Sequence, residues 1–304
     1  GGLVGSPINV VRARTVDLLV PAEAEIVIEG FVNTEYLEPE APFGESHGHV
    51  NLQEYNAFVD VTCITRRRNA IFTSFVGQLA PSEATVMRKP GQEYVFLRHL
   101  RDYLGIKGIK RVYMHMPLTG GYRIFVIQFE RGVPDTEVWR ALYGVTTVQR
   151  PAGKIVIATN DDIDPTNADA ILWALALRAK PHLDMHILPH KDEGHGPRDK
   201  VRDSEDSALL INATLHQDYP PIALPTRPHM ERAREIWEQV LGLPTLKPQA
   251  PWFGYSLGAW TDDLEHEAQL AVKGDYWETG RAAAQRRRRD VKMNTEVRDV
   301  VDEP

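Results

Sequence analysis

Cysteine is nearly absent from this chain of 304 residues, because Cys63 is the only one. A single cysteine excludes an internal disulfide framework and any metal site built from several cysteines. The sequence also lacks an apolar run of about 18 residues, the length that a membrane-spanning helix needs. Its first residues do not show the basic, then apolar, then small-residue pattern of a signal peptide. These absences predict a protein of the reducing cytoplasm that is not inserted in a membrane.

An excess of positive charge is lacking as well. The 42 Asp and Glu residues outnumber the 35 Lys and Arg residues and give a net charge of −7. Binding of nucleic acid needs a basic field against the phosphates, so this balance argues against it. The run Arg286–Arg289 is interpreted as a solvated or subunit-contacting face, because such charge runs on a terminal helix are typically exposed.

The first part of the chain, residues 1–76, has the pattern of β-structure. Runs rich in β-branched and aromatic residues predict strands at Val10–Val20, Glu25–Val32, Phe58–Thr65 and Ala70–Val76. Glu25 and Glu29 lie four residues apart and therefore share one strand face. We interpret both as exposed or edge-strand charges.

The second part, residues 77–304, alternates between strand and helix patterns and predicts an α/β domain with a helical tail. A helix after Ser82 is expected to give way at Pro90 and to resume through Tyr94–Leu104. The polar, glycine-containing stretch between His190 and Tyr219 is predicted to be a mobile or functional connection. The remaining expected strands are Ile109–Met114, Arg123–Phe129, Lys154–Ala158 and Asp184–Leu188. The remaining expected helices are Thr136–Tyr143, Pro165–Ala179, His229–Leu241, Leu264–Lys273 and Tyr276–Arg289.

The segment Pro39–His49 carries two carboxylates, Glu40 and Glu45, between prolines and glycines. Its composition predicts an irregular loop through which neither helix nor strand runs. On such a backbone both carboxylates can converge on one partly dry site, where mutual repulsion lets one of them keep a proton near neutral pH, as a general acid must. Glu45 is the candidate acid, because the adjacent Gly44 allows close approach of a ligand. A solvated surface loop is the alternative.

Three further polar groups have competing interpretations. His47 and His49 could bind a metal, but no third ligand stands at a motif distance, which favours structural histidines or a pocket lining. Asp161, Asp162 and Asp164 resemble a cation cluster, yet their place before a helix favours N-capping. The glycine-rich basic segment Gly194–Lys200 could cradle a phosphate or form a flexible surface turn.

Several motifs together resemble the UbiD family of non-oxidative decarboxylases, which includes the fungal ferulic acid decarboxylases. The resemblance rests on motifs that occur in the family's order along nearly the whole chain. They are Val20–Gly30, Pro39–Gly48, Arg68–Ile71, Thr159–Asp164 and Leu172–Ala174. It implies that residues 1–76 are the later part of a flavin-reductase-like split β-barrel and that residues 77–304 are a mobile or oligomerisation domain.

The resemblance also implies roles for single residues. The family's two catalytic carboxylates fall on Glu40 and Glu45, with Glu45 as the proton donor. Ser46 stands where the cinnamate-type enzymes carry an apolar side chain that faces the substrate, which hints at a more polar substrate. Lys200 stands near the position of a cofactor-contacting lysine, although the spacing is several residues longer. Leu246 or Leu243 falls where an apolar side chain approaches the substrate.

The implied reaction is reversible decarboxylation of an aromatic or α,β-unsaturated carboxylic acid with prenylated FMN, by a homo-oligomer such as a dimer or hexamer. The implied cofactor set includes a divalent ion (Mn²⁺ or Mg²⁺) and K⁺. In the family their ligands, and an Arg that pairs with the carboxylates, lie upstream of the segment that Gly1–Pro7 resembles. The alternative is a non-catalytic subunit or fragment that completes the site of an upstream polypeptide. A flavin-reductase-like oxidoreductase ranks last, because no dinucleotide-binding glycine fingerprint supports it.

Overall fold

The computed structural model of the chain describes residues 1–2, 4–51, 54–115, 122–194, 205–217, 225, 227–245, 261–275, 277–278, 296 and 298. The chain divides into two compact units. The first comprises Gly1–Asp161 and Ala174–Thr214, and the second comprises Asp162–Trp173 and Leu215–Pro304.

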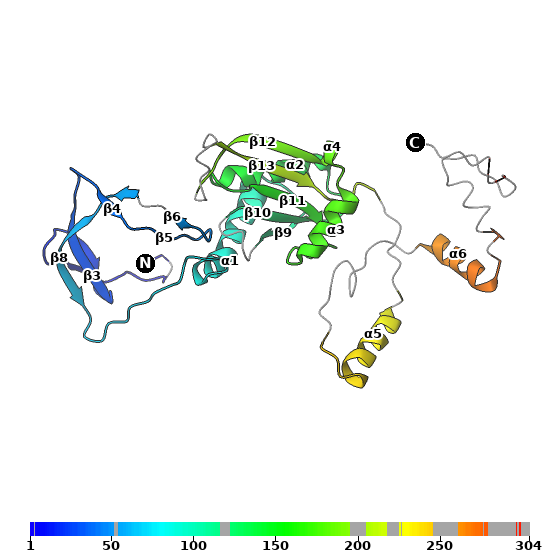
Figure 1. Cartoon of the computed structure of the whole chain (residues 1–304), viewed down its shortest axis with the longest axis horizontal. Coiled ribbons are helices and arrows are strands. Elements are labelled where there is room, and N and C mark those ends of the chain that lie inside the picture. The colour runs from blue at the N-terminus through cyan, green and yellow to red at the C-terminus, as the bar shows by residue number, and fades with distance from the viewer. Residues whose placement is uncertain are drawn as a thin grey trace. The chain divides into compact units, whose positions relative to one another are not determined.

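The first unit begins with short antiparallel strands that pair two by two (Figure 1). The longest pair is β3 with β8, and the others are β1 with β2, β4 with β7 and β5 with β6. The bounds are β1 Val10–Arg12, β2 Leu19–Pro21, β3 Ile26–Val32, β4 Glu38–Glu40, β5 Phe43–Gly44, β6 Val50–Asn51, β7 Glu54–Asn56 and β8 Val59–Arg66. The strands predicted at 25–32 and 58–65 are confirmed. The pattern at 10–20 is a hairpin of two strands and not one strand.

The strand predicted at Ala70–Val76 is wrong, because this segment is irregular. Side chains instead of a neighbouring strand accept its backbone hydrogen bonds. The N–H group of Ile71 donates to Oε2 of Glu25 at 3.1 Å, and that of Val76 donates to Oε2 of Glu83 at 2.9 Å. A β-branched run forms a strand only when a partner strand completes its ladder.

The first unit also contains a five-stranded mixed sheet with the order β12-β13-β11-β10-β9. Strands β10, β11 and β13 are parallel, and the two edge strands β9 and β12 are antiparallel to their neighbours. The bounds are β9 Ile109–Met114, β10 Ile124–Phe129, β11 Ile155–Asn160, β12 Met185–Asp192 and β13 Glu205–Asn212. The predicted α/β class is confirmed. Strand β13 lies in the stretch that was predicted to be an irregular connection, which corrects that prediction.

Helices cover one face of this sheet, and the hydrophobic core lies between them and the sheet (Figure 1). They are α1 (Glu83–Arg98), which continues as the π-helical η1 (His99–Tyr103), and α2 (Asp135–Val148). Fully buried side chains join them to the strands, namely Phe96, Leu100, Val138, Leu142, Val145, Phe125, Ile127, Phe129, Val156 and Leu210. Helix α1 runs through Pro90, so the predicted break at this proline is wrong. Packing of the buried Phe96 and Leu100 beyond the proline outweighs its local cost.

The remaining helices are α3 (Ala168–Arg178), which begins in the second unit, α4 (Pro181–Asp184) in the first, and α5 (Arg227–Glu235), η2 (Ile236–Val240) and α6 (Asp262–Lys273) in the second. Asn167 precedes α3, and its side chain accepts hydrogen bonds from the N–H groups of Asp169 and Ala170. This side chain therefore caps α3, which corrects the N-capping role predicted for the preceding aspartates. None of the described helices is long and apolar enough to cross a membrane.

Candidate active site

Glu40 and Glu45 lie on one interrupted hairpin. Its outer ladder pairs Glu40 with Glu54, and its inner ladder pairs Gly44 with Val50. The predicted strand-free loop is therefore partly wrong, because two short strands run through it and only Ala41-Pro42 interrupts them. Pro39 is tolerated inside β4 because β4 has one strand partner, so the missing N–H group breaks no second ladder.

The tip of the hairpin is a closed turn from Glu45 to His49. The N–H group of Glu45 donates to the carbonyl oxygen of His49 at 2.9 Å, and the N–H group of Gly48 donates to that of Glu45 at 2.9 Å. The N–H group of His49 donates to Nδ1 of His47 at 3.2 Å. This bond uses the Nδ1 lone pair of His47, which a metal ion would need at that atom.

The carboxylates differ in environment. Glu40 is exposed, and its Oε2 accepts a short hydrogen bond from Nδ2 of Asn56. Glu45 and Ser46 are half-buried at the tip. The Asn56 amide holds the Glu40 side chain in one position, whereas the Glu45 side chain combines partial shelter with access to solvent. This division suits a charge-supplying carboxylate and a proton-exchanging one.

A second ion-pair cluster ties the strands to the irregular segment after β8. Glu25 accepts a hydrogen bond from the Nη1 atom of Arg67 at 2.6 Å as well as the one from Ile71. The backbone hydrogen bond from Ile71 and then the hydrogen bond from Arg67 hold the pKa of Glu25 below its ordinary value. Glu25 is therefore a structural anchor for the segment that begins in the Arg68–Ile71 motif.

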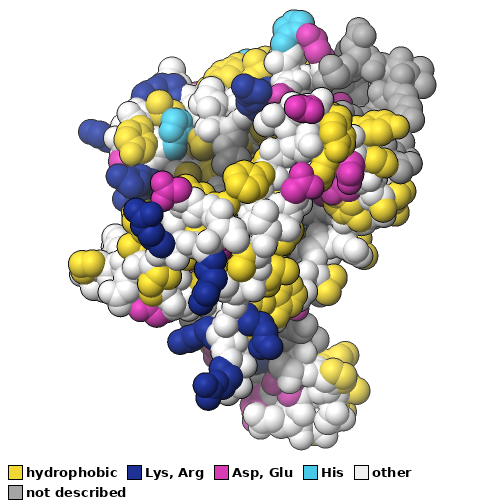
Figure 2. Space-filling model, turned by 90° about the vertical axis from the view of Figure 1, so that its left-hand side faces the viewer, with side chains coloured by type: hydrophobic (Ala, Val, Ile, Leu, Met, Phe, Trp, Pro, Cys, Tyr) yellow, Lys and Arg dark blue, Asp and Glu magenta, His cyan; other side chains and the backbone are white. Residues whose placement is uncertain are grey.

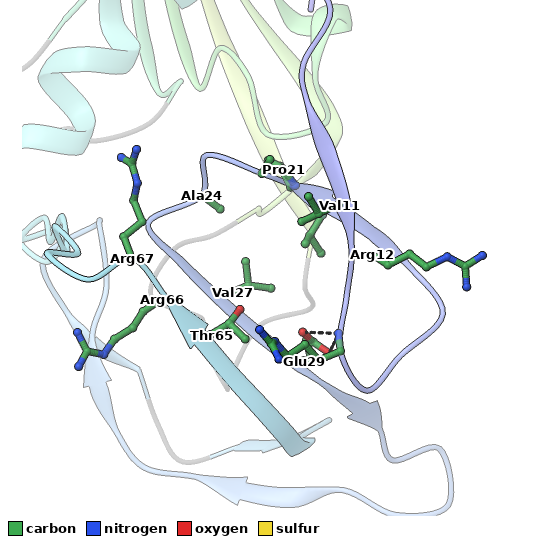
Figure 3. A pocket seen from close by; sticks show the side chains of 12 residues that line it. Val11, Arg12, Pro21, Ala24, Val27, Glu29, Thr65, Arg66 and Arg67 are labelled. Atoms are coloured by element: carbon green, nitrogen blue, oxygen red, sulfur yellow. Dashed lines mark hydrogen bonds between the residues drawn. The ribbon is translucent and has the colours of Figure 1, made fainter.

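Glu29 is buried, with 4% of its surface exposed, so the prediction of an exposed charge is wrong. It lines a cavity of about 400 Å³ between the β1–β2 hairpin and strands β3 and β8. The cavity is also lined by Val11, Arg12, Arg14, Val20, Pro21, Ala22, Ala24, Val27, Thr65, Arg66 and Arg67. Figure 3 shows Val27 and Thr65 beside Glu29, whereas Arg12 and Arg66 extend away from it.

Backbone hydrogen bonds satisfy the buried Glu29 carboxylate. They come from the N–H groups of Arg14 and Thr15, joined by the Thr15 hydroxyl at 2.8 Å. The hydrogen bond from Arg14, followed by that from Thr15, lowers the pKa of Glu29. The burial of Glu29 was missed from the sequence. The signal was a carboxylate inside an apolar run, between Ile28 and Gly30, because an exposed Glu29 gives no reason for its apolar neighbours.

Two predicted site residues, Lys200 and Leu246, lie outside the described residues. The described residues at and just after the end of β12 are held in place. The N–H group of Gly194 donates to Oδ1 of Asp192 at 2.7 Å, and a methyl group at Gly194 would lie 2.3 Å from Cβ of Pro151. Leu243, the other predicted apolar contact, is 38% exposed, and its N–H group donates to the carbonyl oxygen of Trp237.

Comparison with known families gives this hairpin a context. The family model of the UbiD 3-octaprenyl-4-hydroxybenzoate carboxy-lyase Rift-related domain matches residues 1–79. The model of the C-terminal domain of the same carboxy-lyase matches residues 85–193. The two matches together span more than half of the chain and follow one another in the family's order. The chain belongs to the UbiD family, a family of carboxy-lyases.

Individual relatives agree with this assignment. An uncharacterized protein of Archaeoglobus fulgidus is 31% identical over 190 residues, which cover 60% of this chain and 37% of the relative. An evolved dimeric form of the UbiD-class enzyme HmfF from Pelotomaculum thermopropionicum, in complex with prFMN, is 26% identical with a TM-score of 0.57, and the match covers 72% of this chain and 46% of that one. Vanillic acid decarboxylase of Sedimentibacter hydroxybenzoicus in its open form with a truncated D subunit shares the fold, with 21% identity, a TM-score of 0.61 and coverage of 77% and 52%.

The chain thus spans about half the length of these relatives, or less. Glu45 and Ser46 present half-buried polar side chains at a turn. Among residues that the structure describes, no three His, Cys, Asp or Glu side chains gather as a metal site would require.

Proposed function

We propose that this chain carries the proton-donating half of a non-oxidative decarboxylase that uses prenylated FMN. The substrate is an aromatic or α,β-unsaturated carboxylic acid. The observation that supports this most is the closed turn from Glu45 to His49, which holds a half-buried carboxyl group at the tip of a hairpin. The family membership and the prFMN complex of HmfF support the cofactor.

Loss of CO₂ from an sp² carbon leaves the electron pair of the broken C–C bond on that carbon. Bound prenylated FMN supplies the electron sink for that pair. The Glu45 carboxyl group donates its proton to the former carboxyl-bearing carbon and becomes a carboxylate, which solvent can protonate again because the side chain is only half-buried. In this proposal Glu40, whose side chain is held by Asn56, supplies negative charge to the site, and Ser46 contacts the substrate.

The divalent cation and K⁺ that accompany the cofactor phosphate belong, in this proposal, to residues upstream of Gly1. The arginine that pairs with the two carboxylates belongs there as well. Lys200 is proposed as a cofactor contact and Leu246 as a substrate contact. Removal of divalent metal by a chelator is therefore expected to abolish cofactor retention only in a complex that includes those upstream residues.

The test is the variant Glu45→Gln, made in the protein purified with its cofactor and any companion chain. The amide keeps the shape of the side chain but cannot donate a proton, so turnover should fall by about 10²- to 10⁴-fold. The flavin absorption spectrum and the melting curve should stay unchanged. Glu54→Gln is the matched control, because Glu54 is exposed on β7 and pairs with Glu40 across the same hairpin. If Glu45→Gln retains most of its activity, Glu45 is not the acid.

A second candidate function is a subunit or fragment that completes the site of an upstream polypeptide. It is supported by how little of residues 1–79 is buried. Among the described residues of this range, only Glu29 is buried. Apolar side chains of the β3–β8 pair are at least half exposed, namely Ile28, Phe31, Val32, Val59, Val61 and Ile64. Figure 2 shows hydrophobic side chains on this side of the molecule beside Lys and Arg. In contrast, every buried hydrophobic residue that the structure describes lies at Ala80 or beyond.

A sheet that exposes this many apolar side chains favours a partner that covers it. Native mass spectrometry of the chain, alone and with a separately produced polypeptide that corresponds to the upstream half of a relative, tests this function. Association and flavin uptake should appear only in the mixture, and Ile64→Lys should weaken association by at least about 10-fold because it places a charge in an apolar contact. Flavin uptake by the chain alone would contradict this candidate.

A further inference from the structure

Two glycines flank the Glu45 turn, and each lies against a residue of the segment that leads into α1. A methyl group at Gly44 would lie 2.9 Å from both Cγ and Cδ of Gln78. A methyl group at Gly48 would lie 2.7 Å from Cδ1 of Leu79. These short distances show that the hairpin tip rests directly on this segment and that the two glycines leave room for the Gln78 and Leu79 side chains in their present positions.

The segment that contains Gln78 and Leu79 is fixed at both ends to the start of α1. At one end the N–H group of Val76 donates to Oε2 of Glu83 in the first turn of the helix. At the other end Ser82 caps the helix, with its N–H group donating to Oγ1 of Thr85 at 2.8 Å. Helix α1 in turn packs into the core of the five-stranded sheet. The segment is therefore a firm support for whatever rests on it.

The turn transmits this support to Glu45. Gly44 precedes Glu45 directly, and Gly48 is hydrogen-bonded to the Glu45 carbonyl oxygen at 2.9 Å. Gly48 has a φ of +86°, a conformation that side chains other than glycine rarely adopt. Because Glu45 lies between the two contact points, a shift at either one moves its carboxyl group.

We propose that Gln78 and Leu79 are positioning residues, which hold the turn from Glu45 to His49 in place through their contacts with Gly44 and Gly48. The role of the turn in proton donation rests on the proposed function, whereas the contacts do not. Gln78 and Leu79 are exposed, Leu79 by 63%. Truncation of exposed side chains changes the free energy of unfolding by only about 0.5 kcal/mol, so their effect on the turn can be separated from an effect on stability.

Hydrogen exchange of the full chain without cofactor is the first test. Gly44→Ala forces Gln78 away from the hairpin and should raise the exchange rates of the Glu45 and Gly48 amides by about 10-fold. The double variant Gly44→Ala/Gln78→Ala should return both rates to within about 3-fold of the parent chain, because the atoms at 2.9 Å are gone and the new methyl group at position 44 then rests against the remaining Cβ atom at position 78. Gly77→Ala is the control, since a methyl group there meets nothing within 4 Å. Unchanged rates in Gly44→Ala, or no recovery in the double variant, would overturn the inference.

Kinetics of the cofactor-loaded protein is the second test. Leu79→Ala should lower kcat by about 10-fold with little change in KM, since misplacement of a reacting group by about 1 Å costs up to 10²-fold. Leu79→Met, which conserves volume, should restore kcat. If the exchange rates change as expected but the complete protein shows no decarboxylation, the contacts are supported and the proposed function is contradicted. An active parent chain with unchanged kcat in Leu79→Ala would overturn the positioning role alone.

Discussion

The backbone N–H group of Arg14 donates to both carboxylate oxygens of Glu29, at 3.0 Å and 2.8 Å. This relationship closes the β1–β2 hairpin onto β3, because Thr15 beside it donates to the same carboxylate. The hydroxyl of Thr15 lies 2.6 Å from that of Thr62 on β8. One buried carboxylate thus joins three segments in a region that otherwise buries no side chain among its described residues.

Glu29→Gln should loosen this junction, because an amide offers one acceptor oxygen where the carboxylate offers two. We expect faster hydrogen exchange at the Arg14 and Thr15 amides. The lowered pKa of Glu29 gives a stabilising effect that is present above the ordinary carboxyl value of 4.5 and is lost as the pH falls through the folded value. The same amides in the parent chain should therefore lose protection in acid. Glu23→Gln, at an exposed position, is the control, and equal protection in both variants would contradict the assigned role.

Asp206 should make the five-stranded sheet sensitive to acid. Burial by itself raises the pKa of Asp206, but the hydrogen bonds from Lys154 and the Ser207 N–H group, with the charges of Lys154 and Arg123, outweigh it and lower the pKa. The resulting stability is present above the ordinary value of 3.8 and is lost below it, as the pH falls through the folded pKa. In urea unfolding, Asp206→Asn should cost about 1 to 2 kcal/mol at pH 7 and much less at the acid end. A cost that does not depend on pH would contradict the ion-pair explanation.

Two glycines offer a matched pair of stability variants. A methyl group at Gly91 or at Gly105 would meet nothing within 4 Å, but only Gly105 has a positive φ, +67°. Gly91→Ala should therefore stabilise the chain by about 0.5 to 1 kcal/mol, because Gly91 is exposed in the interior of α1. Gly105→Ala should destabilise it by about 1 kcal/mol or more. Denaturation midpoints measured side by side decide this, and equal signs for both variants would show that backbone conformation does not control the outcome.

Substitution of a phenylalanine by alanine should lower stability strongly in the α/β part and hardly at all in the first part of the chain. Phe96 is fully buried against Phe125, with ring centroids 4.4 Å apart, whereas Phe72 is 79% exposed. Phe96→Ala should cost about 3 to 5 kcal/mol. Phe72→Ala should lie within about 0.5 kcal/mol of the parent in the chain by itself. A large cost for Phe72→Ala in the isolated chain would mean that this residue is buried in solution, in a dimer or otherwise.

Local patterns predicted the α/β part well. The segments at 109–114 and 123–129 are short runs rich in apolar and β-branched residues, as buried strands require, and the structure places β9 and β10 there. Helix α1 was placed correctly but was wrongly divided at Pro90, because the cost of a proline is local while the core contacts of Phe96 and Leu100 are tertiary. Strand β13 was missed for a similar reason. Its mixture of polar and apolar residues has no clear period, and its buried position between β11 and β12 is set by its neighbours.

The sequence by itself determined the family motifs, the succession of strand and helix patterns that predicts an α/β domain, and the presence of two glutamates in one proline- and glycine-rich segment. These are local properties, fixed by residue type and spacing. Only the tertiary structure decided that Glu29 is buried and bonded to backbone N–H groups and that Gln78 and Leu79 lie against the Glu45 turn. Each of these contacts joins residues that are distant in the sequence and meet only in the folded chain. The spacing of residue types along the chain does not specify which of them meet.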